Sequence, residues 1–159
     1  GAWYYTDPPH KSPLTHDNYH TGFVLDAILQ YTLASGDRQW LPNYEKGVEF
    51  YASRLFLDDG TPKFLHDKVR PVDIHGAAQG IITFSRAVPV YPGYLDKALD
   101  IAGWVEENML ARDGHFYYQK LRHFTKRFAL MRWTQGWMCL ALSILLTSMK
   151  GLDEGPDGL

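Results

Sequence analysis

The stretch "DDGTPKFLHDKVRPVDIHGAAQGIITFSR" at residues 58–86 decides the fold, because related stretches stand before and after it. Each combines a leading glycine, a short aromatic or apolar segment and a helix that contains a second glycine. The glycine pairs are Gly1 and Gly22, Gly60 and Gly80, and Gly114 and Gly136. The two glycines of a pair are 21, 20 and 22 residues apart, and successive helix glycines are 58 and 56 residues apart. This regularity indicates an internal repeat of about 57 residues.

Each repeat predicts two helices that differ in the distribution of their apolar residues. The helices that contain the second glycines, with "FVLDAIL", "GIITF" and "WMCLALSILL", are apolar nearly all round, which is typical of helices covered on every side. The segments at 40–57 and 94–110 carry one apolar stripe opposite charged residues and predict half-solvated outer helices. The two stripes consist of Leu41, Tyr44, Val48, Tyr51, Ala52 and Leu55, and of Leu95, Ala98, Leu99, Ala102 and Val105.

Length and composition favour one globular domain. The chain has 159 residues, of which 45% are hydrophobic, and we expect a single domain over residues 1–150 followed by a flexible tail at 151–159. With a net charge of −2 and no basic run of the kind that binds nucleic acid, we expect no nucleic-acid partner. The uncharged segment 133–149 is short for a membrane span and predicts a core helix. Its single cysteine, Cys139, is expected to be buried and reduced, which favours the cytoplasm, although the sequence does not assign a compartment.

Paired inner and outer helices at this spacing resemble the α/α toroid, the six-hairpin barrel of many glycoside hydrolases, polysaccharide lyases and sugar epimerases. "RWTQGWM" at residues 132–138 is similar to the inner-helix starts of unsaturated glucuronyl hydrolases, and departs from their Arg-Gly-x-Gly-Trp form. The resemblance implies an all-α fold of about three helical hairpins with short extended segments between them. Because only three inner and two outer helices are predicted, we expect a C-terminal half of a larger toroid. Its exposed ends would be covered by missing N-terminal hairpins or by further copies of the chain.

Polar and aromatic residues gather where the inner helices begin. If these helices run in the same direction, their N-termini meet at one end, where free backbone N–H groups and helix dipoles favour anionic ligands. The candidate catalytic residues there are Asp17, His20, Asp73, His75 and Tyr117. The candidate substrate-binding residues are Tyr4, Asn18, Lys63, Gln79, Arg132, Trp133 and Gln135. Aromatic rings beside carboxylate, amide and guanidinium groups suit a sugar, which offers an apolar face and a rim of hydroxyls.

These residue types allow several reactions. Asp17 and Asp73 are candidates for the two carboxyl groups of a glycosidase, and they are equally good helix N-caps. His20 and His75 suit proton transfer in a lyase or epimerase, with Tyr117 as the second group. Arg132, aided by Lys63 or Lys120, has the geometry to pair with a uronic-acid carboxylate. The sequence predicts a carbohydrate-active protein and does not choose among hydrolysis, elimination and epimerisation.

Two other functions stay open. The first is a non-catalytic arc that binds or scaffolds. The second is an isoprenoid-handling toroid, for which the acidic segment "LDDG" at residues 57–60 is too short to serve as a metal-binding motif. We expect neither a metal nor a cofactor, because His16 and His20 stand alone at helical spacing, outside any HExxH pattern, and no phosphate-binding glycine loop is present.

Overall fold

The computed structural model describes residues 1–153 and consists of five α-helices with short pieces of other structure between them. The helices are α1 (Asn18–Ser35), α2 (Leu41–Arg54), α3 (Ile74–Ala87), α4 (Tyr94–Met109) and α5 (Trp137–Asp153). The remaining elements are a 3-10 turn (Pro9–Lys11), a π-helical turn (Met131–Gly136) and the strands β1 (Val72–Asp73), β2 (Gln119–Lys120) and β3 (Thr125–Lys126). Residues 151–153 of the predicted tail continue α5, and residues 154–159 lie outside the described part.

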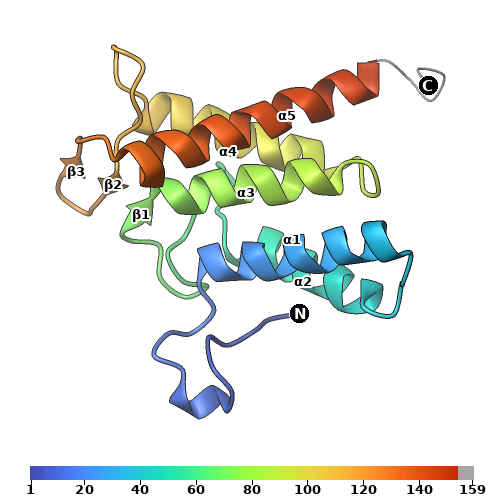
Figure 1. The fold of residues 1–159 in the computed structure, drawn as a ribbon. Helices are drawn as coiled ribbons and strands as arrows, with labels where there is room; N and C mark the ends of the chain where they lie inside the picture. Colours follow the sequence, from blue (N-terminus) through green and yellow to red (C-terminus); the bar gives the residue numbers. More distant parts are fainter. Residues whose placement is uncertain (154–159) are drawn as a thin grey trace.

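The helices form two layers (Figure 1). Helices α1, α3 and α5 run side by side in the same direction, with α3 in the middle, while α2 and α4 run back on the other side of α3. The three inner N-termini therefore meet at one end, beside the antiparallel sheet β1-β2-β3, which fulfils the condition on which the predicted site depends. We call this end of the molecule the mouth. The fold is all-α helical hairpins joined by short extended segments.

The internal repeat is visible in backbone hydrogen bonds. After each outer helix the chain makes the same turn, in which the Gly60 N–H donates to the Leu57 carbonyl (3.1 Å) and the Gly114 N–H donates to the Ala111 carbonyl (3.0 Å). Both glycines have left-handed backbone angles, with φ of +82° and +89°, which side chains disfavour. The turn directs the chain back toward the mouth.

The extended segment after each turn contacts the start of an inner helix. The Asn18 N–H donates to the Phe64 carbonyl (3.3 Å), and the Ile74 N–H donates to the Tyr118 carbonyl (3.2 Å). In the second repeat this contact develops into strand pairing, with Val72 opposite Lys120. The segments that follow the two turns thus become walls of the mouth.

Two helix glycines allow close packing around α3. A Cβ on Gly22 would lie 2.5 Å from Cγ of Gln79, and a Cβ on Gly80 would lie 2.5 Å from Cζ of Phe56. Only a residue without a side chain fits at either position. The repeated glycines therefore set the spacing of α1 against α3 and of α3 against the segment that follows α2.

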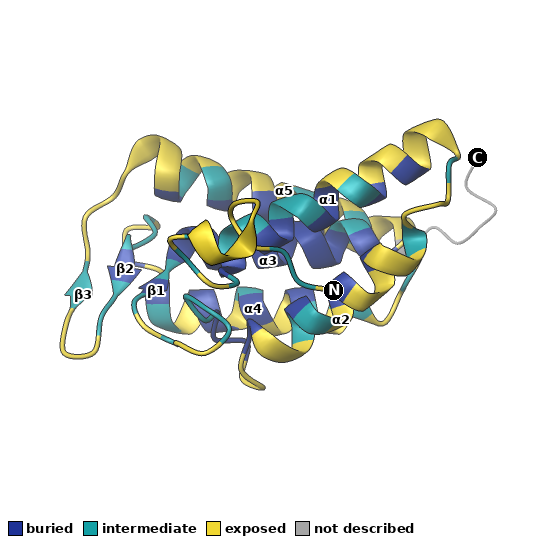
Figure 2. Ribbon diagram, turned by 90° about the horizontal axis from the view of Figure 1, so that it is seen from below, coloured by how far each residue is buried: buried dark blue, intermediate teal, exposed yellow. Residues whose placement is uncertain are grey.

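Burial corrects one prediction for the inner helices (Figure 2). Only α3 is covered on every side, because α1 and α5 pack against it from both flanks. In α5 the side chains of Leu140 and Leu146 are exposed, and so is Cys139, which the sequence predicts to be buried. In α1 Leu33 is exposed. Within residues 1–153, α1 and α5 each have an inner helix on one side only. Apolar residues on every face of these two helices therefore do not lead to burial of every face.

The outer helices follow their predicted stripes with one exception. Leu99 of the second stripe is 38% exposed, and Ile101 and Trp104 of α4 face the core in its place. The uncharged segment 133–149 is divided between the π-helical turn and α5, whose buried residues include Met138 and Ala141. No helix in residues 1–153 has the length and apolar character needed to cross a membrane.

Candidate functional site

A pocket of about 160 Å³ opens at the mouth, between the starts of the inner helices and the first extended segment. Its lining consists of Leu14, Asp17, Asn18, Tyr19, His20, Lys63, Phe64, Asp73, His75, Gly76 and Trp133. Seven of the predicted site residues are among them: Asp17, Asn18, His20, Lys63, Asp73, His75 and Trp133. The starts of α1 and α3, the π-helical turn before α5 and one connecting segment therefore contribute to a single pocket.

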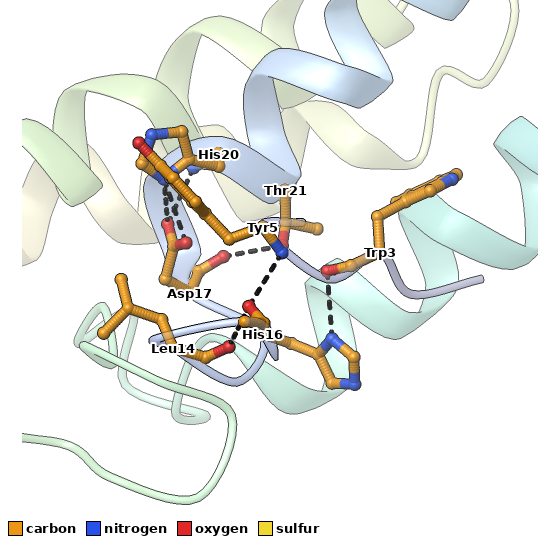
Figure 3. Close-up of polar contacts among 8 residues, drawn as sticks. Trp3, Tyr5, Leu14, His16, Asp17, His20 and Thr21 are labelled. Atoms are coloured by element: carbon orange, nitrogen blue, oxygen red, sulfur yellow. Dashed lines mark hydrogen bonds and ion pairs between the residues drawn. The ribbon is translucent and has the colours of Figure 1, made fainter. Parts of the chain in front are cut away.

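Asp17 and His20 form a hydrogen-bonded pair at the start of α1 (Figure 3). Oδ1 of Asp17 accepts from the His20 N–H (2.8 Å), which confirms Asp17 as an N-cap. The imidazole folds back onto the same carboxylate, with Nδ1 at 2.9 Å from Oδ2. A carboxylate at Nδ1 fixes the tautomer with the proton on that nitrogen and leaves Nε2 as an acceptor. The side chain of Asp17 is 10% exposed and that of His20 is 44% exposed, so the histidine is the accessible member.

The segment before α1 holds this pair in place. The Tyr5 ring packs edge-on against the His20 ring, with centroids 4.6 Å apart. Ser12 ties the segment together, accepting from the Tyr5 N–H (3.1 Å) and donating to the Leu14 carbonyl (2.6 Å). Nδ1 of His16 contacts the Trp3 carbonyl oxygen (Figure 3), at a distance of 3.0 Å. The N-terminal residues thus form one wall of the mouth.

Asp73 is fixed on both carboxylate oxygens. Oδ1 accepts from the His75 N–H (2.9 Å) and caps α3, as predicted. Oδ2 accepts from Nε2 of Gln119 (3.1 Å), whose Oε1 accepts from Lys126 (3.0 Å). Burial raises the pKa of Asp73, although its hydrogen bonds and the nearby Lys126 charge act to lower this pKa. This carboxyl group joins α3 to the sheet.

His75 is buried beneath aromatic rings. It is 2% exposed, and neither ring nitrogen has a hydrogen-bond partner within the described residues. The rings of Tyr19, Trp133 and Trp137 pack on it, with centroids 3.9, 4.2 and 4.7 Å away. Burial, with a smaller contribution from His20, lowers the pKa of His75 to about 4, so the ring is neutral at pH 7. A ligand reaches its nitrogens only after one of the covering rings moves.

Two further lining residues are engaged in structural contacts. The Asn18 amide donates to the Leu55 carbonyl (2.9 Å), and its oxygen accepts from the Tyr51 hydroxyl (2.9 Å), which clamps α1 to α2. Nζ of Lys63 donates to the carbonyl of His66. Both residues shape the pocket, and their polar groups already have partners in the protein.

The structure places five predicted site residues outside the pocket lining. Gln79 is buried deeper along α3, where it donates to Thr83 (3.0 Å) and to Asp26 (3.3 Å). Gln135 clasps the backbone of Phe116, with bonds of 3.0 and 2.8 Å. The remaining three are Tyr117, which lies under the Arg127 guanidinium, Tyr4, which packs on His16, and Arg132, which is exposed. A position near the start of an inner helix does not by itself determine whether a side chain faces the pocket.

The structure adds residues to the candidate site set. Tyr19 and Phe64 line the pocket although neither is among the candidate catalytic or binding residues, because the sequence does not tell whether an aromatic side chain beside a helix start forms a pocket wall or joins the core. Asp26 pairs with Arg86 (2.8 Å), and burial raises its pKa although Arg86 opposes the shift. In the sequence, Asp26 is the one acidic residue within the apolar stretch "FVLDAIL", and this isolated charge is the feature from which a buried ion pair could have been predicted.

No protein-family model and no curated protein sequence matches the chain. Solved structures do match. The α-1,6-mannanase of a Salegentibacter species superposes with a TM-score of 0.70 at 12% identity, over 83% of this chain and 41% of that one. The cellobiose 2-epimerase of Bacillus thermoamylovorans gives 0.67 at 11% identity, over 85% and 40%. The fold is an arc of an α/α toroid.

A third match agrees with this assignment. The α-mannanase of Bacteroides thetaiotaomicron superposes on the toroid arc with a TM-score of 0.62 at 17% identity, over 87% of this chain and 45% of that one. The toroid arc thus spans less than half the length of the structures it resembles. At these identities the comparisons establish architecture, and residue roles must come from the site itself.

Proposed function

We propose that the toroid arc is carbohydrate-active and holds one sugar unit of a glycan in the mouth pocket, with His20 as the proton-transfer group. The observation that carries this proposal is the Asp17–His20 pair, which presents an accessible imidazole in a pocket walled by Tyr19, Phe64 and Trp133. The structural neighbours support a sugar ligand, since one is a mannanase in complex with α-1,6-mannotriose and another is a cellobiose 2-epimerase.

The arrangement favours proton transfer over two-carboxylate hydrolysis. Both oxygens of Asp73 accept hydrogen bonds from the protein, and Asp17 is occupied by His20. The neighbouring mannanase was inactivated by replacing two adjacent aspartates. The adjacent pair Asp58 and Asp59 of this chain lies in the turn before Gly60, and neither residue is part of the pocket lining. Hydrolysis by a pair of free carboxyl groups therefore has weaker support here.

The proposed step is removal of a proton from a sugar carbon that an adjacent carbonyl acidifies. Nε2 of His20 takes the proton, the C–H electron pair forms an enolate, and the Asp17 carboxylate stabilises the resulting imidazolium. The Tyr19 hydroxyl is protonated at pH 7, as a tyrosine ordinarily is and as burial, which raises its pKa, further ensures, and it is available to donate to the enolate oxygen. A water on the opposite face returns a proton to the carbon and gives the epimer, while the His20 imidazolium releases its proton to solvent. Alternatively the imidazolium gives its proton to a β-substituent, which leaves as an alcohol and gives the elimination product.

We expect a neutral sugar in preference to a uronic acid. The lining contains the carboxylates of Asp17 and Asp73, and its Lys63 is bonded to a backbone carbonyl. Arg132 lies outside the lining, and Lys120 donates to Asn108 (2.6 Å). A ligand carboxylate would therefore meet two like charges and no unengaged lysine or arginine in the lining, and only the weaker attraction of the helix N-termini would act in its favour.

The test combines binding with isotope exchange. Neutral and uronate oligosaccharides are titrated by calorimetry, and exchange of a sugar C–H with solvent deuterium is followed by NMR. His20→Gln should abolish exchange while binding persists. The matched control is His115→Gln, because His115 also pairs with an aspartate, Asp113 (2.6 Å), but outside the pocket.

Each outcome decides one part of the proposal. Exchange that survives His20→Gln excludes His20 as the base, and tighter binding of uronates overturns the neutral-sugar assignment. Binding without exchange in the unmodified protein supports the non-catalytic arc. Absence of binding to any glycan overturns the proposed function altogether.

A further inference from the structure

Charge is divided unevenly along the chain. Residues 1–113 contain 10 Lys and Arg against 15 Asp and Glu, whereas residues 114–152 contain six Lys and Arg and no acidic residue. The net charge of −2 therefore hides a basic portion. This portion begins with the strands β2 and β3, which project beyond the helix ends at the mouth in both views (Figures 1 and 2).

The same segment exposes large apolar side chains. Phe124 in the turn between β2 and β3 is 61% exposed, Phe128 after β3 is 53% exposed, and Met131 at the π-helical turn is 82% exposed. Exposed arginines alternate with them along the chain. We call this set the mouth patch: Arg122, Phe124, Arg127, Phe128, Met131 and Arg132. Large exposed apolar side chains grouped on a monomer mark an interaction site.

We propose that the mouth patch docks the protein onto an anionic membrane surface. Arginines attract the negative surface potential of an anionic leaflet, and phenylalanine and methionine side chains enter the boundary between headgroups and acyl chains. A soluble polyanion such as nucleic acid would use the arginines and leave three exposed apolar side chains without a role. A purely apolar protein partner would leave the arginines unpaired. The combination therefore favours lipid over both.

The segment is built to keep these side chains outward. Lys126 is bonded to Gln119 and lies over the Tyr118 ring, with Nζ 5.4 Å from its centroid, and Arg70 donates to the Leu121 carbonyl (3.0 Å). These contacts fix the strands and leave the turn at Phe124 and the residues after β3 on the surface. Docking here brings the opening of the pocket close to the bilayer, since Trp133 of the lining follows the patch directly. The inference stands independently of the proposed function.

The test is co-sedimentation of the chain with vesicles. Phosphatidylcholine vesicles containing 30 mol% phosphatidylserine, chosen as about a third anionic lipid, are compared with phosphatidylcholine alone. We expect binding to the anionic vesicles that weakens as salt is raised. Arg122→Gln with Arg127→Gln should lower the partition coefficient roughly 20- to 30-fold, at about fivefold for each charge. Phe124→Ser with Phe128→Ser should weaken vesicle binding most at high salt, because salt screens the arginines and leaves the apolar side chains as the main contribution to binding.

Matched controls change the same residue types away from the mouth. Arg38→Gln with Arg54→Gln removes two exposed arginines, and Leu33→Ser with Leu146→Ser removes two exposed apolar side chains. These variants should bind vesicles as the unmodified chain does, and circular dichroism verifies that all four double variants fold. Equal loss in controls and patch variants overturns the proposal, as does equal binding to neutral vesicles. Binding to soluble heparin but not to vesicles would show a polyanion site instead.

Discussion

Replacing Gly22 by alanine tests how α1 and α3 pack. The new Cβ would lie 2.5 Å from Cγ of Gln79 and 2.8 Å from the hydroxyl of Tyr51. Both neighbours are fully buried, so neither moves away without cost. Overpacking of this kind costs about 1–3 kcal/mol. Displacing the Tyr51 hydroxyl also breaks its bond to Asn18, at about 1 kcal/mol. The better helix propensity of alanine stabilises the protein by about 1 kcal/mol. The free energy of unfolding should therefore fall by about 1–3 kcal/mol in total.

The control is Gly103→Ala in α4. No atom lies within 4 Å of a Cβ at that position, so only the propensity term acts. This change should raise the free energy of unfolding by about 0.5–1 kcal/mol. Urea denaturation followed by circular dichroism gives both values with a common m-value. If Gly22→Ala stabilises the protein as much as Gly103→Ala does, α1 and α3 are not in the close contact described here.

Three further predictions concern titration and exposure. Burial raises the pKa of Asp73 in the folded protein. The protonated carboxyl group therefore contributes fully to the free energy of unfolding below about pH 4, and this contribution is lost as the pH rises through the raised pKa. Asp73→Asn, which caps the helix equally well, should remove this pH-dependent decrease from the free energies measured by urea denaturation. The NMR signals of His75 should stay those of the neutral ring until about pH 4, and a midpoint near 6.5 would refute its burial. Cys139 should react with a thiol reagent in the native protein at the rate of an exposed cysteine, because α5 leaves it uncovered. Reaction only after unfolding would show that another segment covers it.

The repeat and the helix starts could be predicted from sequence because they depend on local spacing. A glycine-led turn, a period of about 57 residues and an aspartate before each of the first two inner helices specify which segments are helices and where those two inner helices begin. The caps at Asp17 and Asp73 are contacts over two or three residues, so they need no knowledge of distant neighbours. The common direction of the inner helices follows from the same repetition.

Tertiary structure decided which side chains meet. His20 and His75 stand in similar places in their helices, yet one pairs with Asp17 and is accessible, while the other is buried under rings from α1 and α5. Gln79 and Gln135 both stand near the starts of inner helices, and packing directs the amide of Gln79 into the interior and the amide of Gln135 onto the Phe116 backbone. Cys139 is exposed although its helix is apolar, because burial depends on which neighbouring helices cover a residue. Sequence thus fixes local geometry, and the arrangement of neighbouring helices determines which of those positions become a site.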